Sequence, residues 1–559
     1  MSVTRSALPA LADVVVRGRI VTLEGLAGLG LVEAIAVAGD RIIAAGSTRD
    51  IESLAGPRTR SIELPPELTA LPGITDAHLH LADAAIAEDH LDLSTATTLA
   101  QGLALLAEYA SPRPRGWLQG HGWDADRWGG WPTADQLETV APGRKVALWA
   151  HDHHALWVSH AAMAAGSVAI SMPDPQGGLV RRDAAGQPTG LLHETAARLV
   201  STRIPPPSAD DLVSAIARFA VRLEDAGIVA VQDPGSVIPD PDLAVGLPAY
   251  RRLAETGGLR LRVDVSLRQE ALPEAIRRGL RSGASIGPED AGVRIGWLKL
   301  FADGTLGSRT AAMLEPYDVQ PGTLASPGDG RGIFLTGPDE LRELASTAAS
   351  AGIVAQVHAI GDRAVRAALD ALEPTAGASS FHPRVEHVQL VDPADLGRFA
   401  AAGIAASVQP VHLRSDMPAA ATAWGSRVER GGYPWRSLAD EGALIPFGTD
   451  APVEPWDPWP GIEMAVTRTR VARSADPGDG PTSLARHEGL DLARALRAAC
   501  IDGARSAGEL DRGSLGPGMR ADLIVVPTEA LAPEVEPGGP LGRCRPALVM
   551  IGGRVVVER

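Results

Sequence analysis

The 559-residue sequence is poor in cysteine, in net positive charge and in long apolar runs. Its two cysteines, Cys500 and Cys544, form no C-x-x-C pair, which suits a reducing compartment. A formal net charge of −16 argues against nucleic acid or an anionic membrane as a partner, because phosphate binding needs a concentrated basic surface. No apolar run is long enough to span a bilayer. The first residues carry a short apolar patch broken by Asp13, unlike a signal peptide, so we expect a cytoplasmic protein.

Lysine is also nearly absent. Among 52 lysines and arginines, only Lys145 and Lys299 are lysines. Lys299 lies in an apolar, strand-like run, "VRIGWLKLF" (293–301), where its ammonium would be buried. Arginine cannot lose its proton in such surroundings, whereas lysine can, so we expect a chemical reason for lysine here. The alternative is a structural lysine that reaches solvent or pairs with Asp303.

Short apolar runs alternate with helix-patterned segments over most of the chain. The length indicates two domains or a large barrel with insertions. The apolar runs occupy residues 68–80, 227–233, 259–267, 293–301, 352–358, 383–390, 403–410 and 443–450. Because continuous apolar strands separated by helices are typical of parallel sheets, the eight runs predict an α/β fold, a (β/α)8 TIM-type barrel.

Two regions do not follow this alternation. Residues 90–215, after the first barrel strand, form an insertion rich in Trp, Pro and Gly. The two chain ends, 10–60 and 515–559, have the pattern of strands and turns. We therefore predict a small β-sandwich made by both ends, 1–67 and 509–559, attached to a barrel at 68–508.

Potential metal ligands stand where the predicted strands end, which is where barrel enzymes place their active sites. They are His78, His80, Lys299, His358, His387 and Asp450. A His-x-His pair on a strand places both imidazoles on one face, and imidazole with carboxylate is the ligand set of zinc or a similar ion. A lone His-x-His is weak evidence, but the further ligands at later strand ends together indicate a metal centre. A neutral lysine amine there can take up CO2 and become a carbamate, an anionic ligand able to bridge two metals.

Several motifs now show a resemblance to a known family. They are "LPGITDAHLH", "WLKLFADGTLGSRTA", "QVHAIGDRAV", "RVEHVQ" and "FGTDAPVEPWDP". In this order they resemble the signature blocks of the amidohydrolase superfamily, in the branch of N-substituted formamide deformylases and other metal-dependent hydrolases. The resemblance runs from about residue 12 to the end of the chain, and it implies a (β/α)8 barrel with a β-sandwich from both ends.

The resemblance also implies roles for the strand-end residues. His78, His80 and Asp450 would hold one divalent ion, expected to be zinc. His358 and His387 would hold a second, with carboxylated Lys299 as the bridge. Asp450 would also carry the proton from the attacking water to the leaving nitrogen. Asp76 would either support the site from behind or fix the end of its strand.

The substrate contacts are less determined by the sequence. Trp123 and its neighbours either wall an apolar pocket or pack the insertion. His154 matches a family histidine, but the family's arginine is replaced by Ala150 in "ALWAHDHHALWVS", which leaves the substrate class open. Arg309, His412 and Asp416 follow later strands and are further candidates. For Arg309 and Asp416, an ion pair is the competing role.

These observations predict a hydrolase of a C–N bond in a small amide or formamide, using two metal ions, or a single ion if Lys299 stays unmodified. A lactone or ester hydrolase with the same centre is the alternative, because attack on either carbonyl needs the same water and metals. A non-catalytic barrel that binds a partner is a further alternative. Such a protein should lack some of the six ligands, whereas this sequence keeps all of them. The expected partner is a small-molecule substrate, and family habit implies a homodimer.

Overall fold

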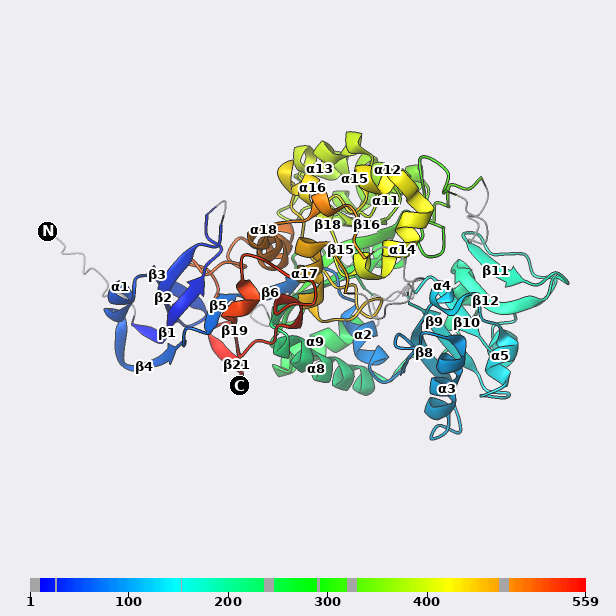
Figure 1. Ribbon diagram of the computed structural model, residues 1–559, viewed down its shortest axis with the longest axis horizontal. Helices are drawn as coiled ribbons and strands as arrows, with labels where there is room; N and C mark the ends of the chain where they lie inside the picture. The colour runs from blue at the N-terminus through cyan, green and yellow to red at the C-terminus, as the bar shows by residue number, and fades with distance from the viewer. Residues whose placement is uncertain are drawn as a thin grey trace.

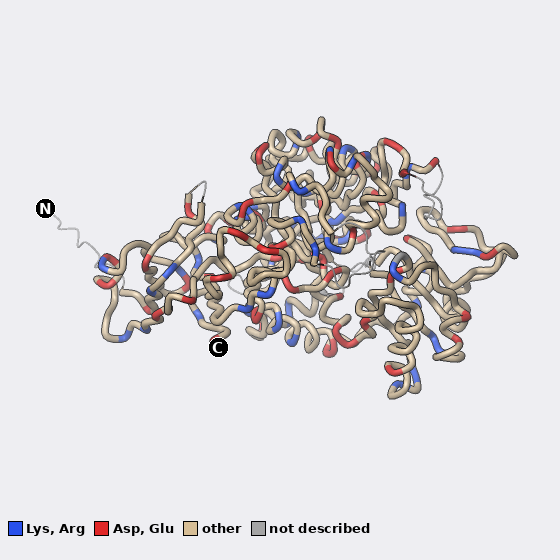
Figure 2. Tube along the Cα trace, viewed as in Figure 1, with Lys and Arg blue, Asp and Glu red and all other residues tan. Residues whose placement is uncertain are grey.

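The computed structural model describes residues 11–25, 28–151, 153–235, 246–288, 292–318, 329–471 and 482–559. Its strands form three sheets, one from the chain ends, one central and one from the insertion (Figure 1). Acidic and basic residues are interspersed along all three parts (Figure 2). Within the described residues, no helix combines the length and the apolar character that crossing a membrane requires.

The central sheet is parallel and has the TIM-type arrangement. Its order is β18-β17-β16-β15-β14-β13-β6, so strands consecutive along the chain lie side by side. The strands are β6 (Ile74–Asp76), β13 (Ile228–Asp233), β14 (Arg262–Arg268), β15 (Val293–Phe301), β16 (Ala355–Ala359), β17 (Arg384–His387) and β18 (Ala405–Ser407). Seven of the eight predicted runs therefore contribute a strand to this sheet.

Helices occupy most of the connections between these strands and much of the chain that follows β18. They are α2 (Leu81–Ala87), α8 (Ala209–Asp225), α9 (Gly246–Thr256), α10 (Leu272–Arg277), α11 (Pro338–Ser350), α12 (Asp362–Leu372), α13 (Leu396–Ala402), α14 (His412–Trp424), α15 (Val428–Gly431), α16 (Trp435–Asp440), α17 (Pro458–Thr467), α18 (Leu492–Arg497) and α19 (Gly503–Ser506). Helix α8 shows why they form. Ser208 caps its first turn by accepting from the Asp211 amide, and Leu212, Ile216 and Phe219 recur at helical spacing and are buried.

The eighth predicted run, 443–450, is not a regular strand but still joins the two edges of the sheet. On one side Val408 and Phe447 form a parallel bridge. On the other side the Ala77 amide donates to the Phe447 carbonyl at 2.8 Å, and the Asp450 amide donates to the His78 carbonyl at 2.6 Å. Proline at 446 has no amide hydrogen, which prevents a full ladder here. The segment is thereby fixed against the first predicted metal-ligand motif.

The first predicted strand, 68–80, is divided between two sheets. Strand β5 (Leu68–Pro72) pairs antiparallel with β19 (Leu523–Pro527) of the terminal sheet, whereas β6 begins the central sheet. Gly73 separates them, and a Cβ at this position would lie 2.4 Å from Val229 Cγ1. Only a glycine lets the chain pass β13 this closely. Continuous apolar composition hid this break from the sequence pattern.

Both chain ends contribute to one eight-stranded sheet, ordered β21-β20-β19-β5-β1-β2-β3 with β4 paired to β1. Its remaining elements are β1 (Ala12–Val21), β2 (Leu31–Ala38), β3 (Arg41–Gly46), α1 (Thr48–Glu52), β4 (Ala55–Glu63), β20 (Leu548–Ile551) and β21 (Arg554–Glu558). The strands form one hydrogen-bonded sheet, so the sandwich arrangement and the exact domain boundaries stay predictions.

The insertion contains a sheet of its own, which the sequence pattern did not predict. Its order is β11-β12-β10-β9-β8-β7. The elements are β7 (Leu91–Asp92), α3 (Leu99–Ala110), β8 (Leu118–Trp123), α4 (Ala125–Trp128), α5 (Ala134–Glu138), β9 (Val146–Ala150), β10 (Ala155–Val158), α6 (His160–Ala165), β11 (Gly178–Arg182), β12 (Pro188–Glu194) and α7 (Arg198–Ser201). Most of these strands are short, so their periodicity is weak in the sequence.

Candidate metal centre

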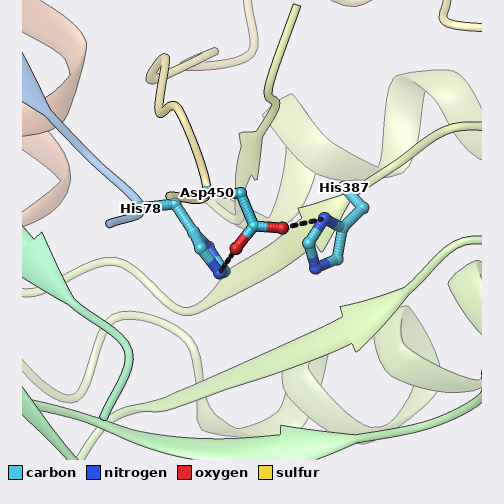
Figure 3. A group of neighbouring side chains, drawn as sticks. All are labelled: His78, His387 and Asp450. Carbon is cyan, nitrogen blue, oxygen red and sulfur yellow. Dashed lines mark ion pairs between the residues drawn. The ribbon is translucent and has the colours of Figure 1, made fainter. Parts of the chain in front are cut away.

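Three of the predicted ligands converge where the strands of the central sheet end. His78, His387 and Asp450 are buried, and one ligand atom from each lies within 4.8 Å of the other two. The Asp450 carboxylate stands between the two imidazoles (Figure 3). Its Oδ1 is 3.4 Å from His78 Nε2, and its Oδ2 is 3.9 Å from His387 Nδ1. The three residues come from three separate segments, so the fold itself assembles this group.

The other three predicted ligands lie around this group. His80 Nε2 is 3.3 Å from Asp450 Oδ1, the same oxygen that His78 faces. The His358 ring is 4.4 Å from the His387 ring, centroid to centroid. Lys299 is buried in β15, with its Nζ 4.9 Å from the centroid of Phe301. All six candidates line a single cavity.

The backbone is strained at two of these ligands. His387 has a φ of 74° and Asp450 a φ of 60°, in the left-handed region that non-glycine residues rarely adopt. Such strain persists where the surrounding structure enforces it, and it is common at functional sites. His78 and His80 also differ from the strand geometry expected for a His-x-His pair. Strand β6 ends at Asp76, and His80 precedes α2, yet both imidazoles still reach the same carboxylate oxygen.

Hydrogen bonds on the outer ring nitrogens fix how three imidazoles point. His78 Nδ1 is 2.6 Å from Glu386 Oε2, and His80 Nδ1 is 2.5 Å from the Gly235 carbonyl. His358 Nε2 is 3.1 Å from the Gly304 carbonyl. Each of these nitrogens donates its proton outward, which leaves the other ring nitrogen with its lone pair toward the centre. This is the orientation that a metal ligand requires.

Arg384 holds Glu386 in place behind His78. Its guanidinium donates to Glu386 Oε1 at 2.8 Å and Oε2 at 3.1 Å. It also donates to the Ala77 carbonyl at 2.6 Å, one residue before His78. Burial opposes ionisation of Glu386, but the Arg384 charge and His78 hold the pKa of this carboxyl well below its usual range. The carboxylate is therefore an anion that fixes both the position and the tautomer of His78.

Asp76 joins the two segments that carry the ligands. Its Oδ2 accepts from Thr449 Oγ1 at 2.7 Å, and its Oδ1 accepts from the amides of Thr449 at 3.1 Å and His78 at 3.2 Å. Of the two roles considered from the sequence, Asp76 thus fulfils both, because it fixes the strand end and supports the site. Asp450, the next residue after Thr449, is positioned by the same contacts.

The charge states suit cation binding. Burial and the Lys299 charge lower the pKa of His78 to about 4 and that of His358 well below its usual value. Burial and the neighbouring His358 likewise hold the pKa of His387 far below normal. Burial also lowers the pKa of Lys299 to about 8, so a minor fraction of its amine is neutral near neutral pH. Three imidazoles are thus neutral around the aspartate, whereas burial opposes protonation of His80 but Asp450 raises the pKa of this fourth imidazole.

Two atoms at the centre support a divalent cation at this place. His78 Nε2 and Asp450 Oδ1 are buried and have no hydrogen-bond partner among the described residues. A buried acceptor without a partner costs free energy, and a divalent ion between these atoms would remove that cost. The donor set of imidazole and carboxylate matches zinc and similar divalent ions.

The cavity has a volume of about 320 Å3 and is lined by both the central sheet and the insertion. His154, His412 and Asp416 line it, as the sequence analysis expected of substrate contacts. Burial opposes protonation of His412, but its 3.1 Å hydrogen bond to Asp450 Oδ2 raises its pKa to about 9. Asp416 is held by Gln389 and by Tyr433 rather than by an ion pair.

Two expected substrate contacts do not line this cavity. Trp123 is 1% exposed within the core of the insertion, and its ring packs edge-on against Trp157. Its indole nitrogen donates to the Leu148 carbonyl at 2.7 Å. Arg309 is buried and donates to the Leu306 carbonyl at 2.9 Å. Packing of the insertion, the alternative considered for Trp123, is therefore what the structure has.

Two residues that support the candidate ligands, Glu194 and Glu386, were not predicted from the sequence. Glu194 accepts from His154 Nδ1 at 2.7 Å and from Thr310 Oγ1 at 2.8 Å, which ties the insertion to the central sheet. The His154 ring is then 5.7 Å from the His358 ring. The sequence offered a signal for Glu386, because two oppositely charged residues, Arg384 and Glu386, stand two positions apart in a short strand next to His387. This spacing places both side chains on the same face of the strand. Glu194 had no such signal, since its contacts join segments far apart in sequence.

The comparisons with known proteins agree with this geometry. The protein YtcJ of Bacillus subtilis (strain 168) is 30% identical over 515 residues, which cover 91% of this chain and 92% of that one. The N-substituted formamide deformylase of Arthrobacter pascens is 26% identical over 520 residues, covering 88% and 90%. An uncharacterized metal-dependent hydrolase from Pyrococcus horikoshii OT3 superposes with a TM-score of 0.71 at 26% identity, covering 92% of this chain and 97% of that one.

The family suggested by the sequence motifs is thus confirmed. The model of the amidohydrolase family matches residues 67–557, a range that includes all six predicted ligands. By this match, the chain belongs to the amidohydrolase family.

Proposed function

We propose that the protein is a metal-dependent hydrolase that cleaves the C–N bond of a small amide or formamide. The observation that carries the proposal is the convergence of three ligand-type side chains on one point, with buried, unpartnered atoms on His78 and Asp450. The similarity to a formamide deformylase and to a metal-dependent hydrolase supports the same chemistry. A binding protein without catalysis would have no need for six side chains of this kind around one cavity.

The residues would hold two divalent ions, with zinc as the expected metal. His78, His80 and Asp450 form one half of the site, and His358 with His387 forms the other. Bound ions of this type activate a water molecule and polarise a carbonyl group. Lys299 lies in the same cavity, where its carbamate would bridge the two halves.

The chemistry of Lys299 follows from its surroundings. Because burial lowers the pKa of its amine to about 8, the neutral form is available to attack CO2. An N–C bond forms, one proton leaves to solvent, and the neutral amine becomes an anionic carbamate with two oxygens. Arginine cannot undergo this reaction under these conditions, which accounts for a lysine in a chain that otherwise uses arginine.

Asp450 would act as the proton carrier. Its carboxylate accepts the proton of the attacking water, and it then delivers that proton to the nitrogen of the breaking C–N bond. His412 donates to Asp450 Oδ2 and keeps the carboxylate oriented. His154, fixed by Glu194, faces His358 from the insertion side and would contact the substrate.

Two broader features complete the proposal. The hydrogen bonds of residues 443–450 to both edges of the central sheet support a closed (β/α)8 barrel. Cys500 and Cys544 are buried and unpaired, which supports a cytoplasmic setting.

The metal content of the purified protein tests this proposal. We expect two ions per chain in the wild type, and fewer in Lys299→Ala, with bicarbonate increasing the metal content of the wild type only. Lys145→Ala is a matched control, because Lys145 is exposed, lies against Trp117 and does not line the cavity. A content of one ion or none that is unaffected by Lys299→Ala would refute the bridged centre.

The reaction itself is tested with matched substrates. The metal-loaded protein is assayed with formamides and amides, and with esters and lactones of the same carbon skeleton. We expect cleavage of the C–N bond, with loss of turnover in Asp450→Asn at retained fold. Cleavage of esters and lactones alone would instead establish the alternative activity.

A further inference from the structure

The cavity has a cationic wall that the proposed chemistry does not use. Arg268 is the last residue of β14, is 6% exposed and lines the cavity. Its Nε and Nη1 atoms are buried and have no hydrogen-bond partner in the part of the chain that the structure describes. A buried charged donor without an acceptor is costly, so an acceptor is expected from outside the described protein atoms.

Two arginines buried for structural reasons, Arg384 and Arg468, look different from Arg268. Arg384 donates to Gln232, Ala77 and Ser407 as well as to Glu386. Arg468 donates to the carbonyls of Leu484 and Tyr433. Neither of these side chains lines the cavity. Arg268 thus combines two properties that Arg384 and Arg468 lack. It lies on the cavity wall, and two of its guanidinium nitrogens have no hydrogen-bond partner among the described residues.

The side chain of Arg268 is nevertheless held in place. Its Cζ lies 4.5 Å from the centroid of the Phe301 ring. Its aliphatic part packs against Gly235, where an added Cβ would lie 3.5 Å from both Cγ and Cδ of Arg268. The guanidinium is therefore preorganised, and a ligand would not have to order it.

The carboxylate of Glu270 does not supply a hydrogen-bond acceptor for Arg268. Glu270 Oε2 is 3.9 Å from Arg268 Nε, beyond hydrogen-bonding distance, and the Glu270 side chain is 34% exposed. Arg198 also lines the cavity but is exposed at its rim. Burial lowers the pKa of Arg268, yet arginine keeps its proton under ordinary conditions. The cavity wall therefore holds a fixed cation, of which Nε and Nη1 have no hydrogen-bond acceptor among the described residues.

Arg268 lies next to the candidate metal centre. In the sheet it is the direct neighbour of Lys299 on β15. Arg268 Cζ and Lys299 Nζ lie 4.5 Å and 4.9 Å from the centroid of the same Phe301 ring, which is 5.3 Å from the His358 ring. One small molecule can therefore span the metal ligands and the guanidinium.

We propose that Arg268 binds a carboxylate of the substrate while the scissile amide of the same molecule lies at the candidate metal centre. The substrate class is then a carboxylate-bearing amide, such as an N-formyl or N-acetyl amino acid with a short spacer. A guanidinium fork pairs with a carboxylate through two parallel hydrogen bonds, which gives orientation as well as affinity. This inference rests on the proposed hydrolysis of an amide at the adjacent centre.

The test compares acids with their neutral counterparts. The probes are N-acetylglycine, N-acetyl-β-alanine, 4-acetamidobutyrate and their N-formyl analogues, each beside its primary carboxamide. Affinity is measured calorimetrically on the metal-loaded protein, and kcat/KM is measured wherever turnover occurs. The variants are Arg268→Gln, Arg268→Lys, and Arg198→Gln as a control that removes the same charge from the rim.

We expect at least one acid to be preferred over its carboxamide by tenfold or more. Arg268→Gln should abolish this preference, Arg268→Lys should keep part of it, and Arg198→Gln should change it by less than about threefold, as a screened rim charge does. A folded Arg268→Gln protein that keeps the preference overturns the inference. If Arg268→Gln does not fold, the wild-type comparison and Arg268→Lys decide.

The outcomes separate this inference from the proposed function. Cleavage of neutral amides without any preference for acids would overturn the carboxylate site and leave the hydrolase proposal intact. Binding of acids that depends on Arg268, without cleavage of any amide, would support the carboxylate site and contradict the hydrolase proposal.

Discussion

Glu386→Gln is expected to weaken metal binding although Glu386 is not itself a proposed ligand. The substitution keeps the size of the side chain but replaces one carboxylate oxygen by an NH2 group. In the wild type, one oxygen faces Arg384 Nε at 2.8 Å, and the other receives both His78 Nδ1 at 2.6 Å and Arg384 Nη2 at 3.1 Å. The glutamine amide has only one oxygen, so it cannot accept hydrogen bonds at both positions. Its NH2 group must then face an N–H donor of Arg384 or His78.

The size of the effect follows from these contacts. Loss of a group that orients a ligating histidine typically costs 10- to 100-fold in metal affinity, or about 1.4 to 2.7 kcal/mol. Breaking a buried ion pair on one side costs about 3 to 5 kcal/mol of folding stability. Both partners here are 0% exposed, so solvent offers no compensation. We therefore expect a fall in both metal affinity and the free energy of unfolding.

The assay is a zinc competition titration against a chelator, with urea unfolding of the same samples. Glu224→Gln is the matched control, because Glu224 is also buried and bonded to a guanidinium, that of Arg260, but lies outside the cavity. It should lose stability without losing metal affinity. If Glu386→Gln binds zinc as tightly as wild type at temperatures where it is folded, the positioning role of Glu386 is refuted.

Two further predictions concern the framework of the site. Asp303 accepts from the amides of Ala312 at 2.7 Å, Ile360 at 3.1 Å and Gly361 at 3.0 Å, so Asp303→Ala should leave three buried donors unpaired. We expect a loss of about 3 kcal/mol or more in urea unfolding, with a smaller loss in Asp303→Asn, and equal stability of the two variants would contradict this. Gly73→Ala should cost about 1 to 3 kcal/mol, because its Cβ would overlap Val229 Cγ1 at 2.4 Å. Combining it with Val229→Ala should cost less than the sum of the two single changes, whereas strict additivity would show that the clash is relieved elsewhere.

Much of the central sheet could be predicted because its signals are local. Each buried parallel strand is a continuous apolar run, and each proposed ligand lies at or near the end of such a run. His358 and His387 could therefore be placed from their position at strand ends alone. The eighth run was placed in the correct location, but Pro446 and the backbone at Asp450 make it irregular, which composition does not reveal.

The remaining features depend on contacts between distant segments. The insertion sheet escaped prediction because short strands such as β10 carry too few residues for a clear period. Trp123 was ambiguous because a tryptophan-rich segment can face a cavity or a core, and only the packing against Trp157 decides. Arg268 was hidden among many arginines, since its lack of a partner is a property of the fold and not of the sequence.

The division of residues 68–80 between two sheets has a consequence for biosynthesis. The His78 segment continues directly from β5, whose antiparallel partner is β19, residues 523–527. In addition, the Gly73 amide donates to the Asp522 carbonyl at 3.1 Å. During translation, the first ligand segment leaves the ribosome more than four hundred residues before its partner strand does. A nascent chain therefore cannot anchor this side of the site until its final strands emerge, and a chain truncated before β19 should accumulate without a properly assembled centre.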